Sequence, residues 1–258
     1  MRVLMIGDVV GRLGRQTLAH LLPTLRRQHR IDLVIANGEN AAGGKGLTPA
    51  TAQELLSAGV DVITSGNHIW EYRELYPLLD DKDSPVLRPH NYPGGAPGRG
   101  VWRRGSVAVV NLQGRVFMPH DVDCPFRAAD ELLTQLKDDA KVIIVDMHAE
   151  ATSEKVALGW YLDGRASAVL GTHTHIPTAD ARILPKGTAY ITDVGMTGAR
   201  DSVIGMEVES VLQRFLTQLP VRLAPVEKGV AVLNAVLVEV DEQSGRAIDI
   251  CRLDCEVE

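Results

Sequence analysis

The sequence has few of the features that mark secreted or membrane-embedded proteins. Its 258 residues include only three cysteines, Cys124, Cys251 and Cys255, which are too few for a disulfide framework. Cys251 and Cys255 could form a redox pair, but two ordinary thiols on a late strand are the simpler interpretation. No stretch approaches the roughly 20 apolar residues that span a bilayer, and Asp8 follows the first apolar run too soon for a signal peptide. We therefore expect a cytoplasmic protein with reduced thiols and no membrane span.

Aromatic residues are also scarce, and basic residues are outnumbered by acidic ones. Aromatic residues make up only 4% of the chain, so valine, leucine, isoleucine and alanine must build the core. The 27 Lys and Arg residues against 33 Asp and Glu residues give a formal net charge of −6. This acidic balance argues against a broad basic surface for DNA and offers no support for tight RNA binding. With 45% hydrophobic and 23% charged residues, the composition is that of an ordinary globular protein.

Short apolar runs alternate with helical patterns from the N-terminus onward. Val3–Ile6, Leu33–Ala36 and Val60–Thr64 predict strands, and helices are expected at 12–28 and from Thr48 to Ala58. This alternation predicts βαβ units with a largely parallel sheet. Further strands are expected at 107–110, 142–145, 168–170, 188–193, 230–240 and 246–253, and further helices near 71–79, 126–137, 153–162 and 206–218.

Residues 84–100 interrupt this alternation with four prolines and four glycines. Such a composition predicts a long ordered loop or rim. A domain linker is the alternative, but the strand pattern resumes soon afterwards, at 107–110. We therefore expect one α/β domain over residues 1–258, with a mixed sheet or two sheets.

Polar side chains directly follow five of the predicted strands. In open α/β sheets, ligands bind beyond the carboxyl ends of strands, so residues that are distant in sequence would converge at one edge. A purely structural role does not predict carboxylates, amides and imidazoles at each of these ends. The residues are Asp8 after 3–6, Glu39 and Asn40 after 33–36, Asn67 and His68 after 60–64, His148 after 142–145, and His173 and His175 after 168–170.

The chemistry of these side chains matches metal ligation. His173 and His175 have period-2 spacing, so an extended backbone would direct both imidazoles to one side. Imidazole together with carboxylate oxygen suits zinc, manganese or iron. Two ions sharing a bridging carboxylate fit better than one, and ions about 3.5–4 Å apart clamp the attacking and leaving oxygens of a displacement at phosphorus. One tetrahedral ion needs only four ligands, whereas the sequence offers six candidates: Asp8, Glu39, Asn67, His148, His173 and His175.

The expected charge of such a centre favours an anionic substrate. Two divalent ions, the carboxylates of Asp8 and Glu39 and a bridging hydroxide leave about one positive charge, which attracts a phosphoester. Taken singly, the same residues have ordinary interpretations: Asp8 as a helix N-cap, Glu39 and Asn40 as turn residues, and His173 as a strand-end histidine. Their joint occurrence at strand ends is what favours a metal centre.

Four motifs and one isolated histidine resemble a known family. They are GDVVGR at 7–12, NGEN at 37–40, GNHIW at 66–70 and GTHTHIPTAD at 171–180, together with His148. This pattern is similar to that of the calcineurin-like metallophosphoesterases, and more narrowly to their bacterial YmdB-like branch, over nearly the whole chain. The resemblance implies a four-layer α/β/β/α sandwich with a dimetal centre at strand ends. It also implies 2′,3′-cyclic nucleotide phosphodiesterase activity in the bacterial cytoplasm.

The resemblance further implies a role for each motif residue. His68 would be catalytic, as the acid or transition-state stabiliser beside the phosphate, while a metal-bridging hydroxide attacks phosphorus. Two divalent transition-metal ions are expected, iron or manganese before zinc. The sequence assigns no substrate-binding residue. The implied ligands are Asp8, Glu39, Asn40 and His175 for one metal, and Glu39, Asn67, His148 and His173 for the other, with Glu39 bridging.

Two other functions stay open at this point. One is a dimetal hydrolase of another class, such as an amidohydrolase. In an amidohydrolase the first His-x-His would typically follow the earliest barrel strand, whereas His173 and His175 follow a late strand here. The other is a regulatory protein that uses the metals to hold a nucleotide or RNA without turnover. A small phosphoester is the expected partner, an indirect link to RNA is compatible with it, and the oligomeric state, a homo-oligomer included, is not determined by the sequence.

Overall fold

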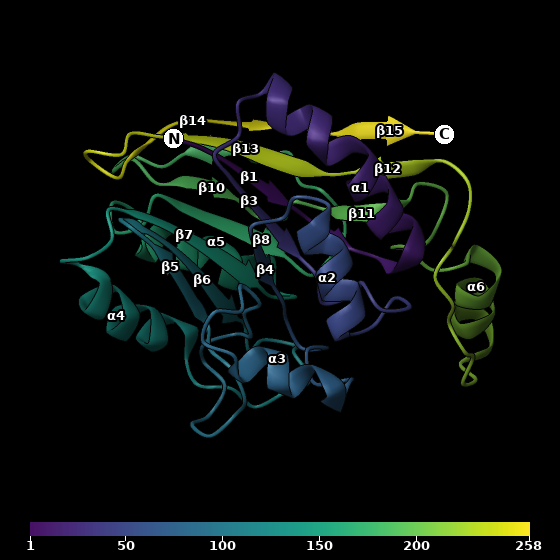
Figure 1. Ribbon diagram of the computed structural model, residues 1–258. Coiled ribbons are helices and arrows are strands. Elements are labelled where there is room, and N and C mark those ends of the chain that lie inside the picture. The colour runs from purple at the N-terminus through teal and green to yellow at the C-terminus, as the bar shows by residue number, and fades with distance from the viewer.

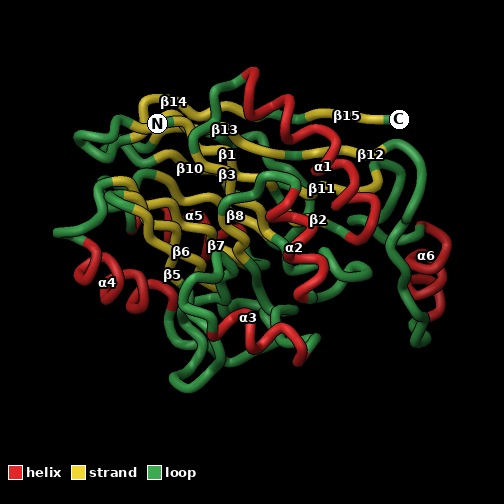
Figure 2. The backbone as a smooth tube through the Cα atoms, in the orientation of Figure 1, coloured by secondary structure: helices red, strands yellow, loops and turns green.

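The computed structural model describes residues 1–258 and contains two large sheets and one smaller sheet (Figures 1 and 2). The first sheet has the order β14-β13-β1-β3-β4, in which β1, β3 and β4 are parallel, and β13 is antiparallel to both of its neighbours, β1 and β14. Its strands are β1 (Arg2–Ile6), β3 (Leu33–Asn37), β4 (Val62–Thr64), β13 (Ala235–Val240) and β14 (Ala247–Arg252).

The second sheet has the order β5-β6-β7-β8-β10-β9, with a parallel centre from β6 to β10. Parallel strands need crossover connections, and helices supply several of them. The strands are β5 (Val101–Arg104), β6 (Val107–Gln113), β7 (Val142–His148), β8 (Ala168–Thr172), β9 (Arg182–Ile183) and β10 (Ala189–Ile191).

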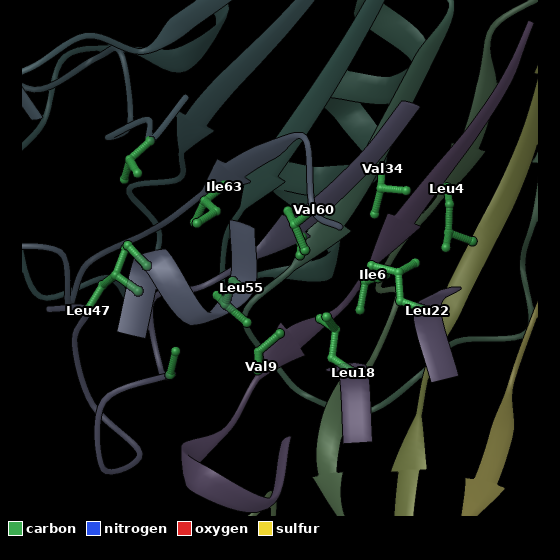
Figure 3. Packing of buried hydrophobic residues seen from close by; sticks show 14 of the residues in the cluster. Leu4, Ile6, Val9, Leu18, Leu22, Val34, Leu47, Leu55, Val60 and Ile63 are labelled. Atoms are coloured by element: carbon green, nitrogen blue, oxygen red, sulfur yellow. The ribbon is translucent and has the colours of Figure 1, made fainter. Parts of the chain in front are cut away.

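Helices cover the outer face of each sheet. On the first sheet, Leu4 and Ile6 of β1 share a buried cluster with Leu18 and Leu22 of α1 (Gly11–Gln28) and Leu55 of α2 (Pro49–Ser57), as Figure 3 shows. On the second sheet, a separate cluster joins β6, β7 and β8 to α4 (Pro125–Leu136) and α5 (Thr152–Tyr161). The helices therefore form the two outer layers.

The two large sheets pack against each other through their inner faces. Val3 and Met5 of β1 alternate with the residues that face α1, because successive strand side chains point to opposite faces. They lie in a third cluster with Ile144 of β7, Leu170 of β8 and Ile191 of β10. The layers are thus helices, sheet, sheet and helices, which confirms the predicted α/β/β/α fold class.

A third sheet of four strands was not expected, and it corrects the prediction of one mixed sheet or two. The apolar stretch at 230–240 is not one strand, since Asn234 divides it between the third sheet and β13. Gly7 makes a similar break after β1, where its N–H donates to the Asn234 carbonyl at 3.0 Å. A Cβ on Gly7 would lie 2.0 Å from the Gly195 carbonyl oxygen, so only glycine fits. The strands are β2 (Asp8–Val9), β11 (Met196–Ala199), β12 (Ala231–Leu233) and β15 (Cys255–Val257).

Helix boundaries follow the sequence signals closely, with one exception. Thr48 caps α2 and Pro49 opens it, as predicted. The helix expected near 71–79 is instead a short 3₁₀ turn, η1 (Arg73–Leu75), followed by α3 (Tyr76–Asp80). Residues 67–70 form a turn and Glu71 a bend, which leaves only a short helical segment.

Two segments are not part of the regular layers, although the first places Val86 and Leu87 in the buried core. Residues 84–100 form a loop region whose one ladder contact is an isolated bridge from Val86 to Ile63. α6 (Val208–Thr217) stands away from the body at the side of the molecule (Figure 1), and its Phe215 is 69% exposed. None of the helices combines the length and apolar character that crossing a bilayer requires.

Candidate metal centre

The predicted site residues come together at the carboxyl ends of strands from both large sheets. Each lies at or just after the end of β1, β3, β4, β7 or β8. Gly66 makes room for this convergence, because a Cβ there would lie 2.1 Å from His148 Nε2 and 2.3 Å from Glu39 Oε2. The structure therefore brings together side chains that are widely separated in the sequence, namely Asp8, Glu39, Asn40, Asn67, His68, His148, His173 and His175.

One group of donor atoms surrounds the Nε2 atom of His148. Within reach of it are His173 Nδ1 at 3.0 Å, Glu39 Oε1 at 3.1 Å and Asn67 Oδ1 at 3.3 Å. Glu39 and His148 are essentially inaccessible to solvent, and Asn67 is buried. Glu39, His148 and His173 also offer ligand atoms that all lie within 4.8 Å of one another.

A second group of donors lies around Asn40 and His175, beside the same oxygen of Glu39. His175 Nε2 is 3.8 Å from Asp8 Oδ1 and 3.1 Å from the amide nitrogen of Asn40. The Asn40 nitrogen also contacts Glu39 Oε1 at 3.3 Å, while its amide oxygen faces His68. The buried Asp8 Oδ1 has no hydrogen-bond partner, although an unsatisfied carboxylate oxygen in the interior is costly.

The distances and atom types around His148 Nε2 fit a shared divalent ion. Donor atoms that each lie about 2.1 Å from a shared ion are roughly 3.0–3.4 Å apart, and the three contacts of His148 Nε2 fall in that range. The unpaired Asp8 oxygen supplies a free ligand atom in the second group. Carboxylate, amide and imidazole donors without thiolate suit iron, manganese or zinc.

The electrostatics of the centre follow from its burial and its close contacts. Burial disfavours a charged His148, but the Glu39, Asp8 and Asp146 carboxylates outweigh it and raise the His148 pKa to about 9. Burial and the neighbouring His148 charge lower the pKa of His173 to about 3. Burial would raise the Glu39 pKa, yet its contacts with His148 and His68 hold that pKa well below the ordinary value. Burial raises the pKa of Asp8.

His68 occupies the rim of the centre. Its Nδ1 lies 3.0 Å from Asn40 Oδ1 and 3.4 Å from Glu39 Oε1, and its backbone N–H donates to Glu39 Oε2 at 3.2 Å. Because both neighbours of Nδ1 are acceptors, Nδ1 carries the proton there and Nε2 is left for another partner. The side chain is 30% exposed and lines a cavity of about 300 Å³ together with Glu39, His173 and His175.

The backbone around the two late histidines differs from the prediction. His173 and His175 have φ values of 105° and 67°, so the segment is not extended and the two imidazoles do not point to one side. His173 turns to His148, and His175 turns to Asn40. Left-handed backbone at residues other than glycine is strained and is found preferentially at functional sites.

A buried ion pair holds this strained segment. Asp193 Oδ2 accepts from Lys155 Nζ at 2.8 Å and from the N–H and hydroxyl of Thr174, the residue between the two histidines. The His173 N–H donates to Asp8 Oδ2 at 3.0 Å. Lys155 and Asp193 are both about 1% exposed. Neither residue belongs to a motif that could be recognised in the sequence, and no role was predicted for Asp193.

Polar residues behind His148 fix the orientation of its ring. The Thr172 hydroxyl lies 2.9 Å from His148 Nδ1 and donates to Asp146 Oδ1 at 2.7 Å. Asn37 Nδ2 donates to Asp146 Oδ2 at 3.2 Å. Burial raises the pKa of Asp146 to about 6. Asp146 precedes His148 by two residues on β7, so the two share a strand face. Asn37 and Thr172 lie at the ends of apolar strands without a signal of this role.

The structure also answers one question about Asp8 and adds one residue, Glu150, to the site. Asp8 does not cap α1, because the N-cap residue is Val10 and no side chain bonds to the first turn. Glu150, to which no role was assigned, lies 3.0 Å from His173 Nε2 at the mouth of the cavity. Glu150 therefore joins the site residues that the sequence did not identify.

The chain is similar to one described family and to several known proteins. A family model described as YmdB-like protein matches residues 4–253. A Bacillus subtilis (strain 168) protein named 2′,3′-cyclic-nucleotide 2′-phosphodiesterase is 50% identical over 257 residues, covering 98% of this chain and 96% of that protein. A structure of a hypothetical protein from Thermus thermophilus superposes with a TM-score of 0.92 at 50% identity over 99% of both chains. A structure described as a novel phosphatase of Mycoplasma pneumoniae has a TM-score of 0.92 at 37% identity, over 99% of this chain and 93% of that one.

Proposed function

The chain belongs to the YmdB-like branch of the metallophosphoesterases, and from this premise we propose that it hydrolyses 2′,3′-cyclic nucleotides at a two-metal centre. The substrate class is that of the Bacillus subtilis relative, which is 50% identical over nearly the whole chain. The reaction would break the bond between phosphorus and O2′ and leave a nucleoside 3′-monophosphate.

The observation that carries this proposal is the set of contacts around His148 Nε2. An imidazole nitrogen, a carboxylate oxygen and an amide oxygen all lie within 3.3 Å of it. Such a set of close donors, from several strand ends, suits a cation that they all share. The proposed ligands are Asp8, Glu39, Asn40 and His175 for one ion and Glu39, Asn67, His148 and His173 for the other.

The proposed ions would supply the main chemical activation. When bound, two divalent ions lower the pKa of a water that they share and withdraw negative charge from the phosphate oxygens. Glu39 would hold both ions, because its Oε1 lies 3.1 Å from His148 Nε2 in one donor group and 3.3 Å from the Asn40 amide nitrogen in the other. For Asn40 to act as a ligand, its amide must rotate by half a turn so that its oxygen replaces its nitrogen beside His175.

His68 would transfer a proton to the leaving group. Its Nδ1 lies 3.4 Å from Glu39 Oε1, an acceptor that remains when the Asn40 amide is turned, so its Nε2 is the nitrogen available to the substrate. As water oxygen bonds to phosphorus and the P–O2′ bond breaks, protonated His68 would donate to O2′ and give the free 2′-hydroxyl.

The remaining expectations are part of the same proposal. We infer iron or manganese as the metals, a cytoplasmic location and a single domain over residues 1–258. A regulatory link to RNA would follow only if turnover of cyclic phosphate ends affects RNA, and the net charge of −6 gives no separate support for RNA binding.

The proposal is tested by assaying metal-loaded protein on 2′,3′-cyclic AMP and 3′,5′-cyclic AMP, with the product identified by chromatography. We expect hydrolysis of the 2′,3′ compound to 3′-AMP. A His68→Asn variant should lose about 10²–10⁴-fold in kcat, the range that a general acid contributes. His20→Asn, on the exposed face of α1, is the matched control. Metal-loaded protein that binds the nucleotide without turnover would instead support the binding-only alternative.

A further inference from the structure

A second hollow adjoins the metal centre on the far side of His68. It has a volume of about 400 Å³, and Asn67 and His68 form its inner wall. His68 lines both this hollow and the cavity of about 300 Å³ that contains Glu39, His173 and His175. The two spaces are therefore neighbours, separated by the proposed proton donor.

Trp70 forms a fixed aromatic wall of this second hollow. Its ring makes edge-to-face contacts with Tyr76 and Tyr92, with ring centres 5.8 Å and 5.2 Å apart and interplanar angles of 83° in both cases. The Tyr92 hydroxyl donates to the buried Gln113 Oε1 at 3.1 Å, which holds the second tyrosine in place. The indole is thus oriented before any ligand arrives.

The outer part of the hollow is aromatic and polar. His120 lines it from the loop between β6 and α4, and its ring centre lies 6.0 Å from that of Tyr92. Across the rim, Lys45 Nζ and Glu71 Oε2 form an ion pair at 2.9 Å. Gly46 allows this approach, since its φ is 83° and a Cβ there would lie 2.7 Å from the Glu71 Cβ.

Substrate chemistry connects this hollow to the metal centre. In a 2′,3′-cyclic nucleotide, the base and the cyclic phosphate are attached to neighbouring carbons of one ribose. If the phosphate lies at the metal centre, the base must therefore occupy a space that borders the same residues. Resting on the proposed function, we propose that the hollow lined by Trp70 and His120 binds the nucleobase of the substrate.

One other hollow borders the metal centre, and its chemistry suits a base less well. It has a volume of about 490 Å³ and meets the metal cavity at Ile204 and Met206. Its walls are mostly aliphatic, with Phe215 on the exposed helix α6 as its one aromatic ring. The Trp70 hollow combines a fixed indole, an imidazole and a charged rim, which are the groups that stack on a base and bond to its edge.

The test compares two substrates that differ only in the base. One is 2′,3′-cyclic AMP and the other is the 2′,3′-cyclic phosphate of methyl riboside, which has no base. In Trp70→Leu and His120→Ala, we expect the preference in kcat/KM for the nucleotide over the base-free compound to fall about tenfold, mainly through KM, as for the loss of one stacked ring. Trp70→Phe retains a ring and should restore part of the preference. Quenching of Trp70 fluorescence by 3′-AMP, lost in Trp70→Leu, is the second readout.

The control is Phe215→Ala in the mostly aliphatic hollow beside α6, which should keep the wild-type preference. An unchanged preference in both Trp70→Leu and His120→Ala, with wild type still hydrolysing the nucleotide, would overturn the nucleobase site and leave the proposed function intact. Loss of the preference in Phe215→Ala alone would place the base in the hollow beside α6, and it would also overturn the nucleobase site at Trp70. If metal-loaded wild type hydrolyses neither compound, the proposed function fails and this inference fails with it. His120 is exposed, so its variant tests the site even if Trp70→Leu does not fold.

Discussion

The carboxylate of Glu39 and the imidazole of His148 lie 3.1 Å apart, and both are essentially inaccessible to solvent. Two such groups would not be buried together for stability alone, because removing charges from water is costly and an apolar pair would serve as well. Each also faces further donor atoms, Glu39 towards Asn40 and His148 towards Asn67 and His173. Their pairing therefore marks the centre of the proposed metal site.

Replacing Glu39 by glutamine should abolish both metal loading and turnover. Glutamine keeps the shape but removes the charge that would be shared by two ions, so we expect a loss greater than the roughly 10–100-fold that outer-shell partners of a metal site contribute. Elemental analysis and kcat on 2′,3′-cyclic AMP are the two measurements. Glu54→Gln, in the ion pair with Arg15 on the surface of α2, is the matched control and should retain both. Full metal content in Glu39→Gln would contradict the assignment.

Metal loading should release protons in a pH-dependent manner. The His148 pKa of about 9 means that this imidazole is protonated at pH 7 in the metal-free protein, whereas His173, with a pKa of about 3, is already neutral. Since a ligating imidazole must be neutral, we expect His148 to release about one proton per chain at pH 7, beyond that of the proposed shared water, and less as the pH rises through 9. Calorimetric titration in buffers of different ionisation enthalpy measures this number. No release at pH 7 would contradict the structure's electrostatics.

Breaking the buried pair of Lys155 and Asp193 should destabilise the fold and loosen the site. Asp193→Asn leaves Lys155 buried without its counter-charge, for which we expect a loss of about 3–5 kcal/mol in the free energy of unfolding. The variant also weakens the contacts to Thr174, so metal affinity should fall as well. Urea denaturation of metal-free protein measures the first effect. The exposed pair of Arg165 and Asp130 provides the comparison, with under about 1 kcal/mol expected for Asp130→Asn. Equal losses in the two variants would refute the positioning role.

The pH dependence of stability should include a contribution from Asp180. Partial burial opposes its charge, but hydrogen bonds from Thr178 and Thr192 lower its pKa below the ordinary 3.8. Its charged form therefore stabilises the folded state above pH 3.8, and this contribution disappears as the pH falls through the lowered pKa. We expect Asp180→Asn to be less stable than wild type by about 1–2 kcal/mol at pH 7, with the difference closing in acid. Urea denaturation at a series of pH values measures this, and a difference that is independent of pH would contradict the prediction.

The sequence predicted the positions of the site residues because the apolar strand runs that precede them are easily recognised. His148 closes the run that begins at Val142, and Glu39 follows Leu33–Ala36, so a parallel sheet had to bring them to one edge. It could not predict the backbone of His173, where hydrogen bonds to Asp8 and Asp193 favour turns over an extended strand. Such bonds join residues far apart in the chain and leave no local pattern.

The same limit applies to the supporting residues and to the third sheet. Lys155 and Asp193 are single polar residues without a motif, and only the packing of α5 against the strand ends makes them a pair. The stretch at 230–240 has the apolar pattern of one strand, so the sequence did not predict the break between β12 and β13 at Asn234. At this break the Asn234 carbonyl accepts a hydrogen bond from the distant Gly7 N–H. Pairings of this kind follow from tertiary structure, whereas periodicity reports only local structure.

The central claim is that Asp8, Glu39 and the late histidines hold two metal ions, and a crystal structure of the metal-loaded protein tests it most directly. Anomalous scattering from iron or manganese locates the ions without reference to activity. The account predicts two peaks about 3.5–4 Å apart, with the Glu39 carboxylate between them, Asp8 and His175 beside one and His148 and His173 beside the other. A single peak, or peaks away from these side chains in fully loaded crystals, would contradict it.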